Sequence, residues 1–368
     1  MEPSSPEKKD CGARVATQAA FPVRKAGATD LCLPILGVGA FSFGGGSYWG
    51  AQSQEDVDSV VGRALDLGIN FFDTAETYNG GESERSLGRA LAGRRGQALI
   101  GSKVQPDNAY HDSLIRHCDG SLRRLGTDYL DLYMLHWPLN PRALAHYTQD
   151  PASLQNPPTI QEAMGALGEL RRQGKIRHIG ISNFGATQMA EAFRTGVPIA
   201  VNELPYNLMM RGIEPEVLGI CERNGLGVLG YMALFQGVLS DKFTTIDELP
   251  PMRTRTRHFR GDRAGSRHGE AGIEGPLVAA LRQLQAEARR LGVSLADLAL
   301  WWAAAKPRIT CTLVGARNRA QLEANVRAVL LPLDPAEHAR LSAITDQVLH
   351  LLGPCVDYWQ NPGESRSW

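Results

Sequence analysis

The stretch Gly68-Ile-Asn-Phe-Phe-Asp-Thr-Ala-Glu-Thr-Tyr78 contains a short apolar run that ends on a carboxylate, Asp73. A run of this length and character predicts a buried strand. Two later runs end in the same way, Ala98-Leu-Ile-Gly-Ser-Lys103 and Leu130-Asp-Leu-Tyr-Met-Leu-His136. Three predicted strands therefore finish on Asp73, Lys103 and His136, and Tyr78 follows shortly after the first of them.

Short apolar runs alternate with amphipathic segments along the rest of the chain. The predicted strands are 35–40, 69–73, 99–103, 130–136, 178–182, 199–203, 227–231 and 310–314. Segments 56–67 and 160–171 space apolar residues three and four apart and end near Gly68 and Gly174, as helices do. This alternation predicts an α/β fold, a (β/α)8 TIM barrel with long loops at the C-terminal face.

A doubly wound open sheet is the rival architecture. Such a sheet usually has a glycine-rich turn after its first strand that leads directly into a helix. Here Gly44-Gly-Gly46 follows the first predicted strand, but Tyr48 and Trp49 come next instead of a helical pattern. The sequence therefore favours the barrel.

In a parallel barrel every strand opens its C-terminal end on the same face, so Asp73, Tyr78, Lys103 and His136 are expected to converge. A phenol has an ordinary pKa of about 10, and a nearby ammonium lowers it. Lys103 would supply that charge, Asp73 would position Lys103, and His136 would orient a carbonyl oxygen. Taken singly, a buried Tyr is usually core and a strand-end Asp usually caps a helix. Together they predict a site that protonates an oxygen while hydride reaches the attached carbon.

Composition narrows the class of partner. The 368 residues are 43% apolar and 21% charged, with a formal net charge of +0, which favours neither nucleic acid nor an anionic membrane. We find no apolar run of the roughly 18–20 residues that a membrane span needs. The six cysteines are scattered without a C-x-x-C pair, so we expect free thiols, a cytoplasmic location and no structural zinc.

Two domain boundaries and two long loops follow from local composition. Residues 1–20 are polar and lack the apolar core of a secretory signal, which predicts a disordered tail before a single barrel domain over 21–368. Segment 140–158 is Pro-rich, and segment 240–275 carries six arginines. Long loops in a compact domain are usually functional or disordered. The second loop is therefore either a lid that contacts an anionic cofactor or a solvated loop.

The residues quoted above, followed by Leu135-His-Trp-Pro138, resemble the aldo-keto reductase superfamily from about Phe21 onward. Tyr206-Asn-Leu-Met-Met-Arg211 and the loop after the seventh strand are closest to its bacterial-type and potassium-channel-β-like branch. The resemblance implies an NADPH-dependent reductase that converts a small aldehyde or ketone to an alcohol, with Tyr78 as the general acid. The alternative is a cytosolic accessory barrel that senses nicotinamide redox state. An unrelated phosphate-sugar isomerase would explain neither Tyr78 with Lys103 nor segment 315–325.

The resemblance also implies a nicotinamide-nucleotide site without a metal. Asn183 would hold the carboxamide, Tyr231 would stack on the ring, and Lys242 would meet the pyrophosphate. Arg317, at a helix N-terminus that favours an anion, would meet the 2′-phosphate, so NADPH or NADP+ is expected over NADH. The full implied set is Ala40, Ser182, Asn183, Glu203, Tyr231, Met232, Leu234, Gln236, Lys242, Gly315, Arg317, Gln321 and Asn325.

Three positions depart from the family's usual pattern. Glu203 stands where Gln is usual, and a carboxylate can accept a hydrogen bond from the carboxamide but cannot donate one. Met232-Ala233 replaces the usual Ser-Pro, and Ala324 replaces a Glu. These changes would affect cofactor affinity more than chemistry.

Aromatic residues near the expected active face suggest the substrate walls. Phe41, Trp49 and Trp137 are the candidates, and hydrophobic core is the competing interpretation for Phe41 and Phe43. The C-terminal segment from Tyr358 either folds over the pocket or packs as a tail. The sequence names no specific substrate and leaves a homo-oligomer open.

Overall fold

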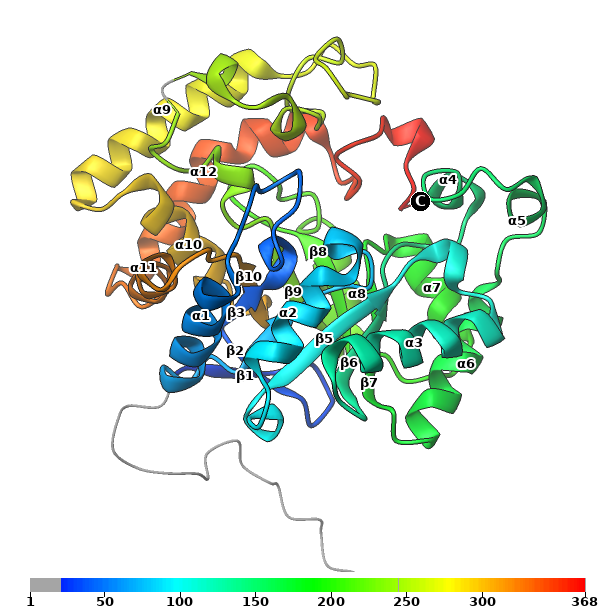
Figure 1. Cartoon of the computed structure of the whole chain (residues 1–368). Helices are drawn as coiled ribbons and strands as arrows, with labels where there is room; N and C mark the ends of the chain where they lie inside the picture. Colours follow the sequence, from blue (N-terminus) through cyan, green and yellow to red (C-terminus); the bar gives the residue numbers. More distant parts are fainter. Residues whose placement is uncertain (1–20, 244, 368) are drawn as a thin grey trace, which may run out of the picture.

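The computed structural model describes residues 21–243 and 245–367, and within them eight parallel strands close into a barrel (Figure 1). The barrel strands are β3 (Leu36–Gly39), β4 (Phe71–Asp73), β5 (Leu99–Val104), β6 (Leu130–Leu135), β7 (Ile176–Ser182), β8 (Val201–Pro205), β9 (Gly227–Tyr231) and β10 (Cys311–Val314). Their order around the ring is β10-β3-β4-β5-β6-β7-β8-β9, and β9 pairs back with β10. The predicted (β/α)8 barrel is confirmed, and the doubly wound sheet is excluded.

Helices surround the barrel in alternation with its strands (Figure 1). They are α1 (Gln54–Asp66), α2 (Glu82–Ala90), α3 (His111–Leu125), α4 (Pro141–Leu144), α5 (Pro151–Gln155), α6 (Ile160–Arg172), α7 (Ala186–Arg194), α8 (Val217–Arg223), α9 (Glu274–Leu291), α10 (Leu295–Ala305), α11 (Arg319–Val329) and α12 (Pro335–Leu352). Ser53 and Thr159 cap α1 and α6 through side-chain oxygens that accept backbone N–H bonds. Such caps satisfy donors that a helix N-terminus leaves unpaired.

A hairpin closes the N-terminal end of the barrel, and sequence patterning did not predict it. Its strands β1 (Val23–Lys25) and β2 (Cys32–Pro34) pair antiparallel just before β3. Leu31 and Leu33 pack into a buried cluster with Phe71, Leu132 and Leu229, which come from three barrel strands. The hairpin therefore fills the interior at the N-terminal end of the barrel. The C-terminal end of the barrel remains available for a site.

The C-terminal ends of the strands are covered by long segments. Figure 1 shows α9, α12 and the C-terminal segment above the barrel, with the C-terminal end beside α4. Asn140 at the start of α4 donates to the carbonyl of Arg366. A Cβ at Gly185 would collide with the carbonyl oxygen of Ser367. The C-terminal segment therefore folds back across the face where the site is expected.

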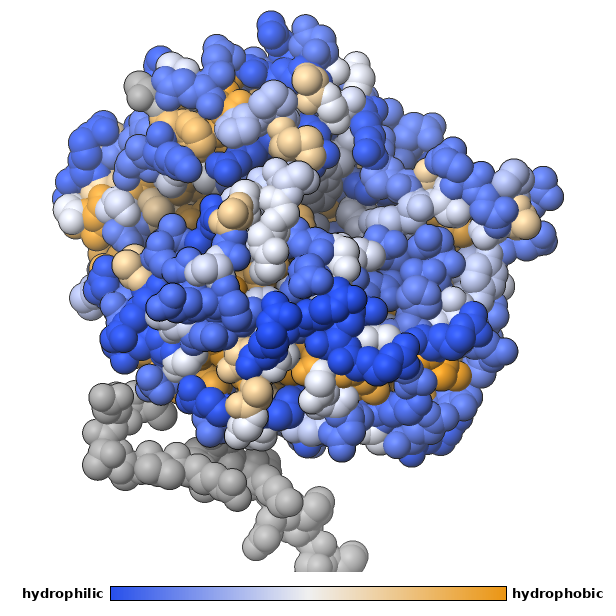
Figure 2. All heavy atoms as spheres, viewed as in Figure 1, coloured by the Kyte–Doolittle hydropathy of each residue, from blue (hydrophilic) through white to orange (hydrophobic). Residues whose placement is uncertain are grey.

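Two expectations from composition, the lack of a membrane span and the free cysteine thiols, can be compared with the structure. The face in Figure 2 is largely hydrophilic, with apolar residues in small separate areas. No helix in the described ranges is long and apolar enough to cross a membrane. Cys118, Cys221 and Cys311 are buried free thiols, as expected, but Cys32 is disulfide-bonded, so the expectation is wrong there. The predicted tail, residues 1–20, lies outside the described residues.

The hairpin should contribute to stability through burial. Leu33 is fully buried and Val23 on the same hairpin is 47% exposed. We predict that Leu33→Ala lowers the free energy of unfolding by about 2–5 kcal/mol because it leaves a cavity at the base of the barrel. Val23→Ala should change it by no more than about 0.5 kcal/mol. Urea unfolding of both variants measures the difference, and equal effects would show that the hairpin is only peripheral.

Candidate active site

The ends of three adjacent strands bring the four predicted catalytic residues together. Asp73 is the last residue of β4, Lys103 lies near the end of β5, and His136 directly follows β6. The register places Asp73 opposite Gly101 and Lys103 opposite Met134. Tyr78 begins a short 3-10 helix, Tyr78–Gly81, after β4. Neighbouring parallel strands thus deliver an acid, an amine, an imidazole and a phenol to one face.

Lys103 is the centre of this group. Its side chain has no solvent exposure, and Nζ donates to Asp73 at 2.6 Å (Oδ1) and 2.7 Å (Oδ2). Nζ also donates to the carbonyl of Thr74 at 3.0 Å and to the Tyr78 hydroxyl at 3.4 Å. A buried ammonium is tolerated only when it is paired and hydrogen-bonded, and these contacts meet that condition. They also fix the ammonium beside the phenol.

Glu203 on β8 brings a second carboxylate to the same ammonium. Its Oε1 lies 3.4 Å from Nζ of Lys103, and its Oε2 is buried without a hydrogen-bond partner among the described residues. Burial, together with the charge of Asp73, raises the pKa of Glu203 to about 8. Burial also raises the pKa of Asp73, against the opposing effect of Lys103. One ammonium therefore faces two carboxyl groups, and the pKa values of both are raised.

The pKa of Tyr78 differs from the sequence-based prediction. Lys103 acts on it in the predicted direction, downward, but burial is the larger effect and raises the pKa above its ordinary value. Asp73 and Glu203 add to that rise because their charges oppose formation of a phenolate. The ammonium alone would lower the pKa, but two carboxyl groups share it. Tyr78 is accordingly a protonated phenol at neutral pH.

His136 is held as a neutral imidazole. Burial, followed by the charge of Lys103, lowers its pKa well below the ordinary value. Its ring lies 5.7 Å from the Tyr78 ring in a T-shaped arrangement, and Nδ1 has no hydrogen-bond partner among the described residues. A neutral imidazole offers one N–H donor. The donor and the phenol can act on the same oxygen atom.

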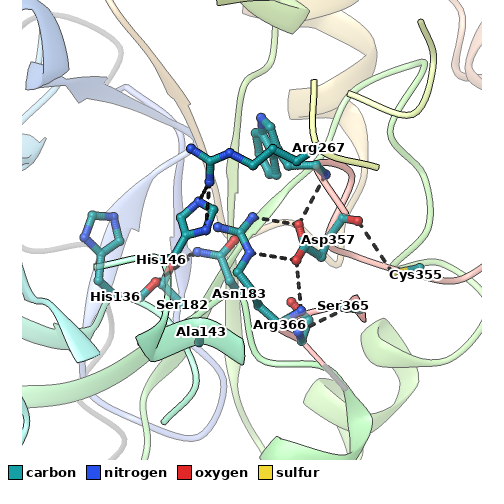
Figure 3. A network of polar contacts seen from close by, with 12 residues as sticks. His136, Ala143, His146, Ser182, Asn183, Arg267, Cys355, Asp357, Ser365 and Arg366 are labelled. Atoms are coloured by element: carbon teal, nitrogen blue, oxygen red, sulfur yellow. Dashed lines mark hydrogen bonds and ion pairs between the residues drawn. The ribbon is translucent and has the colours of Figure 1, made fainter. Parts of the chain in front are cut away.

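Ser182 and Asn183 at the end of β7 lie beside His136 (Figure 3), and Tyr231 at the end of β9 joins them. Nδ2 of Asn183 donates to the His136 carbonyl and to Oγ of Ser182, both at 3.0 Å. The hydroxyl of Tyr231 donates to Oδ1 of Asn183 at 2.7 Å. Asn183 and Met232 have φ values of 64° and 60°, a left-handed conformation that non-glycine residues adopt mainly where surrounding structure enforces it.

A cavity of about 720 Å³ opens above these groups. Its lining includes these predicted residues: Phe41, Trp49, Asp73, Tyr78, His136, Trp137, Ser182, Asn183, Glu203, Tyr231, Met232, Leu234, Gln236, Lys242, Gly315, Arg317 and Gln321. Three predicted residues are outside the lining. Lys103 lies beneath it, Ala40 is fully buried, and Asn325 donates to the carbonyl of Gly315.

One end of the cavity is cationic and lies over β10. Arg317 donates from Nη1 to the Trp49 carbonyl at 2.7 Å and also contacts the Ala51 carbonyl. Its backbone N–H donates to Oε1 of Gln321 at 2.9 Å. The guanidinium has no carboxylate partner within residues 21–243 and 245–367. An uncompensated guanidinium at the start of α11 suits a phosphate.

The six arginines of the 240–275 loop divide into two groups. Arg257, Arg260 and Arg263 form ion pairs with acidic residues, chiefly Glu270 and Glu274. The remaining three, Arg253, Arg255 and Arg267, line the cavity. The loop is therefore packed onto α9 by one set of arginines and presents the other set to the cavity, so the solvated-loop alternative does not describe it.

Part of the cavity wall was not predicted from the sequence. His146 and Tyr147 come from the segment between α4 and α5, and Arg366 comes from the C-terminal segment. Arg366 is held by Asp357 at 2.7 and 2.8 Å (Figure 3), and its guanidinium lies 3.7 Å from the Trp137 ring centre. In the sequence, the aromatic pair Tyr358-Trp359 is the one feature that pointed to this wall. Phe43 is fully buried core.

Nucleotide chemistry fits the residues present better than metal chemistry does. In the described part of the chain no group of three or more His, Cys, Asp or Glu side chains is arranged to hold a metal ion. Among the described residues, buried polar atoms without hydrogen-bond partners do line the cavity, including Oε2 of Glu203 on β8 and Nε of Arg317 after β10. A polar ligand could supply partners to both atoms.

Comparisons with known proteins agree with this geometry. The model of the aldo/keto reductase family matches residues 35–346. An aldo-keto reductase of Bacillus subtilis, YhdN, is 33% identical over 304 residues, which cover 78% of this chain and 83% of the relative. The NADH-specific methylglyoxal reductase of Escherichia coli is 29% identical over 84% of this chain and 94% of its own length.

A solved structure shows the same fold. The aldo/keto reductase from Klebsiella pneumoniae, in complex with NADP and acetate, superposes with a TM-score of 0.65 at 26% identity, over 89% of this chain and 96% of that one. The family model covers all eight strands of the barrel. This chain belongs to the aldo/keto reductase family of oxidoreductases.

Proposed function

We propose that this protein is an NADPH-dependent reductase that converts an aldehyde or ketone to an alcohol by hydride transfer, with Tyr78 as the general acid. The observation that carries the proposal is the buried contact between the Tyr78 hydroxyl and Nζ of Lys103, 3.4 Å apart, with Asp73 behind the ammonium and His136 beside the phenol. Bound NADPH would supply the hydride.

In the proposed reaction, the protein's own residues donate the proton to the carbonyl oxygen. Tyr78 holds its proton at neutral pH and would give it to the carbonyl oxygen as hydride reaches the carbon. The phenolate left behind would be stabilised by the ammonium of Lys103, which Asp73 keeps in position. His136, neutral and close to the phenol, would orient the same oxygen by donating a hydrogen bond.

Glu203 would act at the nicotinamide carboxamide. A carboxylate at this position could accept a hydrogen bond but not donate one. Since burial and Asp73 raise the pKa of Glu203 to about 8, its carboxyl group carries a proton at pH 7 and can donate from the buried oxygen that lacks a partner. The protonated acid would thereby reproduce the hydrogen-bonding capacity of the glutamine usual in the family.

The relatives do not fix the nucleotide, because one is NADH-specific and another binds NADP. The side chains of this chain support NADPH. Arg317 has no carboxylate partner among the described residues, and Lys242 and Arg253 line the same cavity. A 2′-phosphate would supply the missing negative charge.

Replacement of the acid tests the reaction. We predict that Tyr78→Phe lowers kcat for an aromatic aldehyde by about 10²–10⁴-fold, the usual contribution of a general acid. NADPH affinity, measured by fluorescence titration, should stay within about twofold of wild type because the ring and its packing remain.

Tyr129→Phe is the matched control, since Tyr129 lies between Arg95 and Arg177, far from the cavity lining. Near-normal turnover in Tyr78→Phe would remove the phenol from its role. NADPH binding by wild type without turnover of any carbonyl would instead favour the redox-sensing accessory barrel.

Replacement of Arg317 tests the nucleotide. We expect Arg317→Met to raise the Kd for NADPH about 10–100-fold, the loss expected when a charge-assisted hydrogen bond is removed. NADH lacks the 2′-phosphate, so its Kd should rise much less. Arg327→Met, an exposed arginine further along α11, provides the control. A parallel loss for both nucleotides would mean that Arg317 only anchors the segment 49–51.

The shifted pKa of Glu203 gives stability a pH dependence. Its folded-state value of about 8 exceeds the ordinary Glu value of about 4.3. Between these values the folded state keeps a proton that the unfolded state releases, so stability falls as pH rises, by up to about 1.4 kcal/mol per pH unit.

We predict that the Tm of wild type falls more steeply from pH 5 to pH 8 than that of Glu203→Gln. Glu222→Gln, which changes a 59% exposed side chain on α8, should keep the wild-type slope. Identical slopes for wild type and Glu203→Gln would show that Glu203 is ionised throughout this range.

A further inference from the structure

The cavity contains more positive charge than a nicotinamide nucleotide accounts for. Its lining has two acidic side chains, Asp73 and Glu203, and both face Lys103 beneath the floor. Six cationic side chains line the rest: Lys242, Arg253, Arg255, Arg267, Arg317 and Arg366. Away from the reacting centre, every charged side chain among the described lining residues is therefore a cation.

These cations lie at two different edges of the barrel. Arg317 follows β10, and in the ring order β6 is the strand directly opposite β10. Trp137 and His146 both come after β6. Arg366 lies over the Trp137 ring. Figure 3 shows that Arg267 contacts the His146 ring. Arg267 and Arg366 thus occupy the edge opposite the proposed phosphate site.

Arg267 and Arg366 differ in how their charges are paired. Arg366 is neutralised by Asp357, but Arg267 and Arg255 have no carboxylate partner in the part of the chain that the structure describes. Burial and the charges of Arg366 and Arg267 lower the pKa of His146 to about 4, so the ring is neutral at pH 7. Burial, followed by the charges of Arg366 and Arg255, also lowers the pKa of Arg267.

Other arginines of the same loop do form ion pairs with acidic residues. Arg257, Arg260 and Arg263 each pair with an acidic residue. Arg267 and Arg255, by contrast, face a cavity whose wall at that edge is made of aromatic rings, those of Trp137, Tyr147 and Trp359. Aromatic walls hold the carbon skeleton of a ligand, and free guanidinium groups select carboxylate or phosphate.

We propose that the carbonyl substrate carries an anionic group, a carboxylate or a phosphate ester, which Arg267 and Arg255 bind while its carbonyl lies at Tyr78 and His136. This inference rests on the proposed carbonyl reduction and names the substrate class for it. Arg366, fixed by Asp357 against Trp137, adds positive potential and shapes the wall. An anion at this position would relieve the mutual repulsion of the arginines.

The test compares aldehydes of similar shape and different charge. 4-Carboxybenzaldehyde and its neutral methyl ester are reduced by the full chain with saturating NADPH at constant ionic strength, and 4-formylphenyl phosphate is run beside them. We expect wild type to favour the carboxylate or the phosphate over the ester about tenfold or more in kcat/KM, mainly through KM. Whichever anion has the lower KM identifies the group that the arginines select.

Arg267→Gln should lower the ratio of kcat/KM for the preferred anion over the ester about tenfold, and added NaCl should lower the wild-type ratio. Arg260→Gln is the matched control from the same loop. Its side chain is 59% exposed and paired with Asp262, so the ratio should not change. Because Arg267 is also exposed, its replacement should not impair folding.

The outcomes separate this inference from the proposed function. Efficient reduction of the ester with no preference for either anion would overturn the anionic substrate and leave the reductase standing. An equal change of the ratio in Arg267→Gln and Arg260→Gln would also overturn it. If wild type binds NADPH but reduces none of the three aldehydes, the proposed reductase itself fails and the inference fails with it.

Discussion

The structure of the active face depends on one buried ammonium. Lys103 has no solvent exposure, and moving an ion out of water costs several kcal/mol unless partners replace the water. Asp73 on the adjacent strand supplies two short hydrogen bonds, and the Thr74 carbonyl supplies a third. Tyr78 can lie 3.4 Å from this charge because the turn after β4 brings the phenol back over the same strand ends.

The second carboxyl group modifies this arrangement without breaking it. Glu203 lies near Lys103, yet Asp73 already satisfies most of the ammonium. Two buried carboxylates cannot both ionise beside one cation without strong repulsion. The raised pKa of Glu203 eases this conflict, because a protonated carboxyl group carries no charge. Burial, with the charge of Asp73 adding to it, outweighs the effect of Lys103, so the pKa of Tyr78 rises although an ammonium lies beside it.

Features encoded locally were predictable from the sequence, and features that depend on distant partners were not. Each barrel strand is a short apolar run, and the rule that parallel strands open on one face is enough to bring Asp73, Lys103 and His136 together. Nothing local distinguishes Arg263 from Arg267. The first pairs with Glu274 on α9 and the second faces the cavity, a difference set by packing of the loop. The buried β1–β2 hairpin and the returning C-terminal segment likewise depend on contacts far apart in sequence.

The ring order of the barrel separates three tasks that share one cavity. The proposed reacting centre lies on β4, β5 and β6, and the proposed phosphate site follows β10. The second cationic edge combines the segment after β6, the 240–275 loop after β9 and the C-terminal segment. Arg267 and Arg366 belong to segments that contribute nothing to the Lys103 cluster. Residues at that edge can therefore change the substrate that is bound without altering the ammonium, the phenol or their spacing. Such independence lets loops on a rigid barrel set specificity while the strand ends keep the chemistry.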